Sequence, residues 1–213
     1  MESSVEALKG WAMSHLDWFG QSAFRIRSES GRAVFIDPWR VPASAGPADL
    51  ILVTHPHGDH YDRKAIEGLR KPGTVIVLPR SCAGEGQTGI SAGESLSVGA
   101  MRVSGVAAYN QTKRFHPKTS SWLGYLLEVD GMRVYHAGDT DVIAEMRELR
   151  PDIALLPIGG IFAMDWRAGV EAAGLLKASL SIPMHYSCLL GGRSAGRRFA
   201  RRIGPGAMVM PRK

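Results

Sequence analysis

The chain has only two cysteines, Cys82 and Cys188, in 213 residues. So few thiols exclude a small fold held by disulfides, and we expect both side chains to be reduced. The sequence also lacks any run near the roughly 18 apolar residues that a transmembrane helix needs. Glu2 and Glu6 stand where a secretory signal would carry basic residues. These absences predict a cytoplasmic protein without a membrane span.

The chain also lacks an internal repeat or a linker that would divide it. We therefore expect one domain over residues 1–213, and 45% hydrophobic with 22% charged residues is typical of a globular protein. The net charge of +6 favours anionic ligands. Arg197, Arg198, Arg201 and Arg202 have the spacing of an exposed helix face, so a nucleic-acid partner is not expected. Oligomer formation is left open.

Two series of apolar segments predict an α+β fold with two sheets packed face to face and helices outside. The first series comprises strands at 15–19, 23–27, 32–36, 50–54 and 74–78, a helix at 61–70 and an exposed connection at 81–93. The second comprises strands at 94–98, 101–108, 122–129 and 133–136. Helices at 141–149, 166–178 and 194–203 then alternate with short strands at 153–156, 181–184 and 207–210.

The run Thr54-His55-Pro56-His57-Gly58-Asp59-His60 directly follows one of these strands. Its three imidazoles and one carboxylate offer four metal ligands at one strand end. The proline fixes a backbone angle and the glycine frees one, which favours a tight loop with converging side chains. The alternative is a solvated histidine-rich loop, but such tracts are usually looser and repetitive. The run therefore predicts a metal site.

The ends of three other predicted strands carry further candidate residues for the metal site. Asp139 follows the strand at 133–136 and could bridge two metals, or could only cap the next helix. His185 follows the strand at 181–184 and could be a ligand or an ordinary buried histidine. Asp37 could accept a hydrogen bond from a ligand histidine, with Thr54 as a second supporting residue, or could only begin a turn.

The runs His55-Pro56-His57-Gly58-Asp59-His60, Gly138-Asp139-Thr140 and Pro183-Met184-His185-Tyr186 resemble the successive motifs of the metallo-β-lactamase superfamily. The segments Ala108-Tyr109-Asn110 and His116-Pro117-Lys118 are similar to the branch that includes L-ascorbate-6-phosphate lactonase. N-acylphosphatidylethanolamine-hydrolysing phospholipase D is a more distant relative. The resemblance covers nearly the whole chain and implies a four-layer αβ/βα sandwich with the site at one edge of the sheets.

The resemblance also implies a ligand set for two divalent metal ions. His55 and His57 would bind the first ion, and Asp139 would bridge. Asp59, His60 and His185 would bind the second ion. Zinc is the expected metal, with manganese or iron as alternatives because a set with fewer imidazoles favours harder ions.

Two positions depart from the superfamily pattern. A third histidine usually serves the first metal, but the equivalent stretch here offers Asn110. Asn110 could be a weak oxygen ligand, His116 could reach in, or the first ion could be poorly held. Our hypothesis places Asn110 near the metal and His116 in the substrate pocket. Gln21 stands where relatives often have histidine.

The implied activity is hydrolysis by a metal-bound hydroxide of an ester, lactone or phosphodiester in a small anionic substrate. Asp59 and Asp139 would orient the attacking water. Arg114, Lys118 and Tyr186 are the candidate substrate-binding residues, although the two cations could also only solvate their loop. The alternatives are a nuclease of the same superfamily and a metal-bound scaffold or sensor without catalysis.

Overall fold

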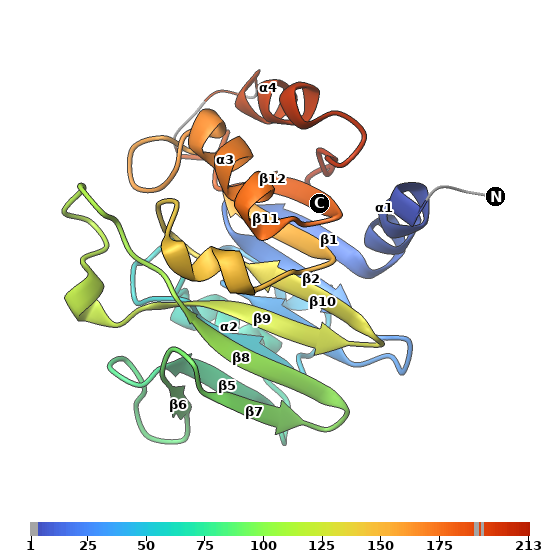
Figure 1. Cartoon of the computed structure of the whole chain (residues 1–213). Coiled ribbons are helices and arrows are strands. Elements are labelled where there is room, and N and C mark those ends of the chain that lie inside the picture. The colour runs from blue at the N-terminus through green and yellow to red at the C-terminus, as the bar shows by residue number, and fades with distance from the viewer. Residues whose placement is uncertain (1–3, 190–191, 193) are drawn as a thin grey trace.

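The computed structural model describes residues 4–189, 192 and 194–213. Within these residues, two six-stranded sheets pack face to face with helices on their outer sides (Figure 1). The first sheet runs in sequence order: β1 Leu16–Gly20, β2 Ala23–Arg27, β3 Ala33–Ile36, β4 Leu50–Leu52, β5 Val75–Pro79 and β6 Thr88–Ile90. The second runs in reverse order: β12 Leu180–Met184, β11 Ile153–Pro157, β10 Met132–His136, β9 Leu123–Val129, β8 Met101–Ala107 and β7 Ser95–Val98.

Each sheet combines an antiparallel part with a parallel part. Strands β1 to β3 and β7 to β10 pair antiparallel, whereas β3 to β6 and β10 to β12 pair parallel. Parallel strands are buried on both faces, which explains the uninterrupted apolar runs of β4 and β11. Because parallel strands end on the same side, their carboxyl ends bring several loops to one edge.

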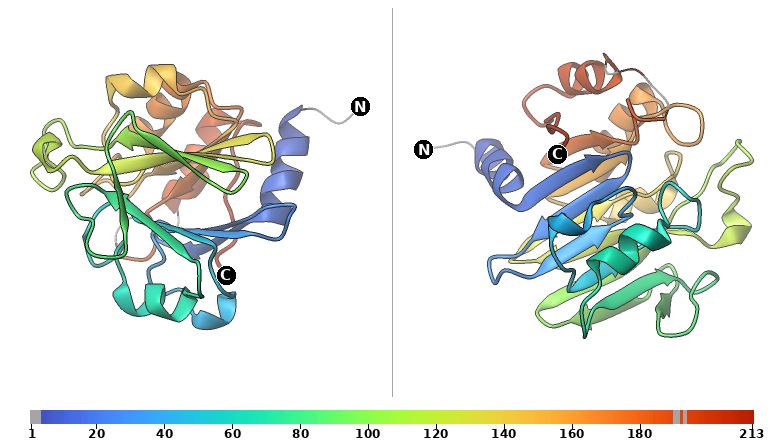
Figure 2. Two further views of the ribbon diagram at one scale, coloured as in Figure 1. Left: turned by 90° about the horizontal axis from the view of Figure 1, so that it is seen from below. Right: turned by 180° about the vertical axis from the view of Figure 1, so that it is seen from behind.

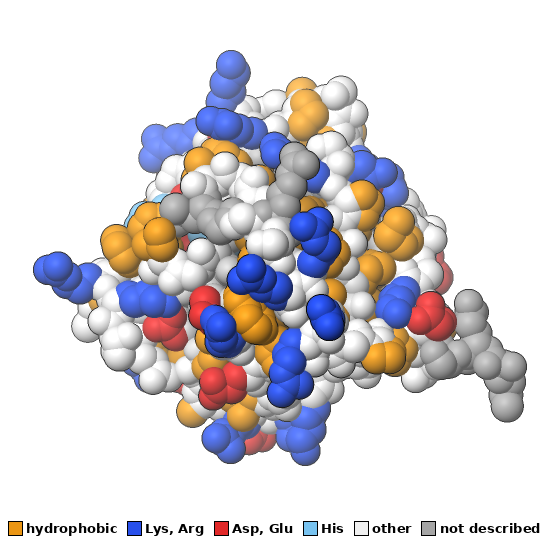
Figure 3. All heavy atoms as spheres, turned by 90° about the horizontal axis from the view of Figure 1, so that it is seen from above, with side chains coloured by type: hydrophobic (Ala, Val, Ile, Leu, Met, Phe, Trp, Pro, Cys, Tyr) orange, Lys and Arg blue, Asp and Glu red, His pale blue; other side chains and the backbone are white. Residues whose placement is uncertain are grey.

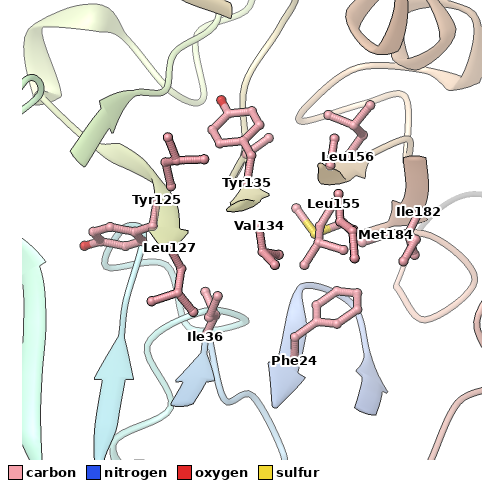
Figure 4. Close-up of a cluster of buried hydrophobic side chains, with 14 of the residues drawn as sticks. Phe24, Ile36, Tyr125, Leu127, Val134, Tyr135, Leu155, Leu156, Ile182 and Met184 are labelled. Atoms are coloured by element: carbon pink, nitrogen blue, oxygen red, sulfur yellow. The ribbon is translucent and has the colours of Figure 1, made fainter. Parts of the chain in front are cut away.

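The main core lies between the sheets. Phe24 and Ile36 from the first sheet point toward Val134, Leu155 and Met184 from the second, and all five side chains are fully buried (Figure 4). Side chains alternate across a strand, so a neighbour of one inward residue faces outward. A second apolar cluster accordingly forms on the outer face of the first sheet and consists of buried residues such as Phe35, Ile51, Ile66, Leu69 and Ile76.

Helices cover both outer faces. Helix α2, Arg63–Leu69, is capped by the Asp62 side chain and lies against the first sheet (Figure 2). Helix α3, Trp166–Leu176, contacts β11, and α4, Ser194–Ile203, contacts β12. Helix α1, Ser4–His15, lies beside β1, β2 and β12. In the described part of the chain, no helix combines the length and apolar character needed to cross a membrane.

Most predicted elements are present, with four differences. The helix expected at 141–149 is only the 3-10 helix Ala144–Glu148, because Asp141 is tied by its backbone N–H to Tyr109. The strand expected at 207–210 is reduced to one bridge between Ala207 and Ser181. The connection at 81–93 contains the short strand β6. Helix α1, which was not predicted, precedes the first strand. Two further 3-10 helices are Ala43–Ala45 and Lys118–Ser120.

Candidate metal centre

Among the described residues, seven side chains that can bind metal meet at the edge where the strands end. They form three overlapping groups, and within each group one ligand atom of every residue lies within 4.8 Å of the others. The first group is His55, His57 and His116, and the second group is Asp59, His60 and His185. A linking group joins His55, His60 and Asp139. The structure thus brings together every residue that the resemblance assigned as a ligand.

His116 completes the first group. Its Nε2 atom lies 3.3 Å from Nε2 of His55 and 3.5 Å from Oδ2 of Asp139. The Asn110 amide is used differently: its Oδ1 atom accepts from the His116 backbone N–H and lies 3.1 Å from His116 Nδ1. Its Nδ2 atom donates to Asp141 and to the carbonyl of Phe162. The structure therefore puts His116 beside His55 and His57, and Asn110 behind His116.

The second group has the spacing of ligands around one cation. Oδ2 of Asp59 lies 3.7 Å from His60 Nε2 and 3.6 Å from His185 Nε2. Asp139 contacts both neighbours, with 3.0 Å from Oδ2 to His185 Nε2 and 3.6 Å from Oδ1 to His60 Nε2. Ligands at bond lengths of about 2.0–2.2 Å stand roughly 3–3.5 Å apart, so these separations lie within or slightly above the spacing that zinc-like ions require.

Asp37 and Thr54 support the loop that carries the ligands. Asp37 Oδ2 lies 2.7 Å from His60 Nδ1 and accepts from the Thr54 hydroxyl at 2.7 Å, while Oδ1 accepts from the Thr54 backbone N–H. Thr54 Oγ1 also lies 2.9 Å from His55 Nδ1. Both imidazoles are thereby oriented with Nε2 toward the centre, which is the usual role of a carboxylate behind a metal-binding histidine.

Asp139 reaches the centre through a tight turn. Gly138 has φ +63°, and a Cβ atom at this position would lie 2.9 Å from the carbonyl oxygen of Leu123. Only glycine accommodates both the left-handed backbone and this close approach. The turn places the Asp139 carboxylate between the two groups.

A cation would satisfy atoms that otherwise lack partners. His60 Nε2 and Asp139 Oδ1 are buried without a hydrogen-bond partner among the described residues. A buried polar group without a partner costs about 1–3 kcal/mol, and more when it is charged. The donor set of imidazoles and carboxylates therefore fits a divalent metal at this edge.

The protonation of the two groups differs. Burial lowers the pKa of His55 and His57, and it lowers the pKa of His116 to about 4. Burial also opposes charge on His60 and His185, but neighbouring carboxylates, above all Asp139, outweigh it and raise both pKa values, that of His185 to about 10. Without a cation, the imidazoles of the first group are neutral at pH 7, whereas His185 of the second group holds a proton.

The pKa values of the two carboxyl groups are shifted in the opposite direction to those of His60 and His185. Burial raises the pKa values of Asp59 and Asp139, but His185 and His60 outweigh it and hold both below the ordinary value. Both carboxylates are therefore ionised at neutral pH and available as ligands.

The predicted substrate-binding residues are distributed unevenly. Lys118 Nζ lies 3.2 Å from the Tyr109 hydroxyl and 3.4 Å from Glu145, so it ties its loop to the 3-10 helix. Arg114 is exposed in the same loop. Tyr186 does not reach the centre: it is 3% exposed and stacks on Trp18 at 5.3 Å. The prediction for Tyr186 is therefore not supported by its position.

Two aromatic residues lie near the centre that the sequence did not predict as part of the site. The Trp122 ring stacks on His55 at 5.2 Å and meets His57 edge-on at 4.9 Å. Phe162 contributes its carbonyl, 3.1 Å from His116 Nδ1, and its ring packs on Phe115 at 4.6 Å. Neither belongs to a motif, and only the folded loops bring them to the histidines.

Comparison with known proteins supports the same class of site. Residues 15–185 match the family model described as a beta-lactamase superfamily domain. A "UPF0173 metal-dependent hydrolase" of Korarchaeum cryptofilum is 36% identical, covering 82% of this chain and 83% of the relative. One of Thermococcus onnurineus is 35% identical, covering 82% and 85%. The structure of a metallo hydrolase from Ignicoccus hospitalis has a TM-score of 0.72 at 26% identity, covering 92% and 94%.

The fold, the cluster of histidines and aspartates, and these matches define a metal-dependent hydrolase with a metallo-β-lactamase sandwich. The chain belongs to the metallo-β-lactamase superfamily and, within it, to the UPF0173 metal-dependent hydrolases.

Proposed function

We propose that the protein is a dinuclear hydrolase that cleaves an ester, lactone or phosphodiester bond in a small molecule. The observation that carries this proposal is the position of Asp139, which lies within 3.5 Å of both His116 and His185 and so links the first group to the second. The first group, with three imidazoles, suits zinc, and the second offers a harder set that also suits manganese or iron.

The chain's own residues divide the work. When bound, two divalent cations would lower the pKa of a water between them to about 7 and so supply a hydroxide nucleophile. Asp59 and Asp139 are ionised and can accept a hydrogen bond from that water, which orients its lone pair toward the substrate. Trp122 packs against two imidazoles and limits the access of bulk water on that side.

The rim of the centre supports a substrate with one anionic group and an apolar part. Arg114 is the one cation of the segment 110–118 without an ion pair to any residue that the structure describes, since Lys113 and Lys118 contact Asp141 and Glu145. Three exposed apolar side chains also belong to loops that carry or adjoin the ligands: Phe115, Ile161 and Leu189, at 46%, 52% and 51% exposure. Hydrophobic side chains border visible histidine atoms on one face of the molecule (Figure 3).

The narrower resemblance to L-ascorbate-6-phosphate lactonase stays a hypothesis, because the relatives named above carry only a general description. Both cysteines are free thiols, which supports our proposal that the protein acts in the cytoplasm.

Metal analysis followed by a substrate screen tests the proposal. Purified protein should hold two equivalents of divalent metal and should hydrolyse members of a panel of lactones, esters and phosphodiesters. Asp59→Ala should abolish turnover. Tight metal binding without turnover would instead support the scaffold or sensor, and a steep salt dependence of binding to single-stranded RNA would support a nuclease.

A further inference from the structure

Gln21 lies against the second group although it belongs to no ligand motif. It occupies the turn between β1 and β2 with φ +48° and is 1% exposed. Its Nε2 atom lies 2.8 Å from Asp59 Oδ2 and 3.0 Å from His185 Nε2. These two distances are at or slightly below the lower end of the roughly 3–3.5 Å that separates neighbouring ligands of one cation.

The backbone around Gln21 is held from several directions. Its carbonyl accepts from the His185 backbone N–H at 2.8 Å and from the Trp18 indole at 3.0 Å. Its N–H donates to Cys188 Sγ at 3.3 Å. His136 Nε2 lies 2.9 Å from the carbonyl oxygen of the next residue, Ser22. The Gln21 side chain is therefore aimed by a fixed turn rather than by a mobile loop.

The two ends of the Gln21 amide have unequal surroundings. The nitrogen faces Asp59 and His185, whereas the oxygen is buried without a hydrogen-bond partner among the described residues. A half-turn about the last side-chain bond exchanges the two ends at almost no change in shape. A cation between Asp59, His60 and His185 would repel the NH₂ dipole and attract the carbonyl, so metal binding favours the exchange.

We infer that Gln21 binds the second metal through its side-chain oxygen, as a neutral ligand beside Asp59, His60 and His185. The inference rests on the proposed dinuclear centre. An amide oxygen adds no charge and is harder than an imidazole, so it favours manganese or iron over zinc in this position. Gln21 would then help to decide which metal the second group holds.

Three variants and a cobalt titration test the assignment. Replacing Gln21 by leucine removes the ligand at similar size, so the second Co²⁺ should bind at least about tenfold more weakly. Its visible absorption should strengthen, because the coordination number falls. Gln21→Glu supplies a charged oxygen and should bind the second ion more tightly than wild type. Gln87→Glu is the matched control, because it adds the same charge beside Tyr61, and it should leave both measurements unchanged.

The opposite results separate the possible failures. If Gln21 only donates a hydrogen bond to Asp59, Gln21→Leu will leave the cobalt absorption unchanged. Gln21→Glu will then weaken the second ion by placing two carboxylates together. Either result overturns the inference while the dinuclear centre stands. Wild-type protein that binds a single equivalent would instead overturn the proposed function itself.

Discussion

The first and second groups lie side by side, but the pKa values of their histidines are shifted in opposite directions. Around His55, His57 and His116, burial lowers the pKa values, so the imidazoles are neutral. Around His60 and His185, carboxylates raise the pKa values above the ordinary one. The first group is therefore ready to bind a cation, whereas His185 of the second group must release a proton to do so.

The two groups also differ in how the chain supplies their last ligand. His185 follows β12 directly, with φ +56° and its backbone N–H bonded to Gln21. His116 instead lies within the irregular segment between β8 and β9, where Asn110 and Phe162 fix its ring. A rigid strand end serves one group and a braced loop serves the other.

Removing the last ligand of each group should give the largest effect. His116→Ala and His185→Ala should each lower the metal content by one equivalent and lower kcat/KM by about 1,000-fold, or about 4 kcal/mol. Metal analysis beside kinetics on the substrate found by screening measures both. His15→Ala, at the end of α1, is a control that should change neither. A variant that keeps two equivalents would remove that histidine from the ligand set.

The residues behind the ligands should give the next largest effect. Asn110→Leu should lower the affinity for the first ion by about 10–100-fold and leave the affinity for the second nearly unchanged, because only His116 loses its support. Asp37→Asn should weaken the second ion by a similar factor, because the carboxylate orients His60. Competitive titration with a metal-sensitive dye resolves the two affinities. Equal losses at both ions in both variants would contradict the division into two groups.

The sequence predicted the part of the centre that is local in the chain. Four ligands lie within His55–His60, and Asp139 and His185 each follow a strand, so hydrophobic pattern and turn chemistry suffice to find them. His116 could not be assigned in the same way. It stands in an irregular loop, and its position depends on contacts to Asn110 and Phe162 that exist only in the folded protein.

Tyr186 shows a second limit of the sequence. It follows a ligand directly, so it was predicted to bind substrate, but the left-handed backbone of His185, φ +56°, turns the chain just after β12 and sends the two neighbouring side chains in different directions. His185 faces the centre, whereas Tyr186 packs on Trp18 under α4. A different limit applies to the strand predicted at 207–210: its residues suit a strand, but in the described part of the chain it forms only one bridge to a neighbour.

Lowering the pH should weaken metal binding at the second group more than at the first, by a smaller factor than the substitutions above. His60 and His185 have raised pKa values without a cation, so protons compete with the second ion more strongly as pH falls through the neutral range. The competition lowers affinity by about tenfold per pH unit for each proton displaced. His116, with a pKa of about 4, competes only in acid. Calorimetry in two buffers of different ionisation enthalpy should show proton release for the second ion only. Equal release for both would contradict the assigned charges.

The smallest expected effect concerns the loop that supplies His116. Arg114→Gln should raise KM about fivefold for an anionic substrate and leave a neutral analogue unchanged, because an exposed charge contributes little. Lys118→Met provides the contrast: it breaks the contacts to Tyr109 and Glu145, which brace the loop. That variant should therefore weaken binding of the first ion and slow the hydrolysis of both substrates alike. If Arg114→Gln changed KM equally for both substrates, Arg114 would act through the loop and so through His116. The proposal that the substrate is anionic would then lose its main support.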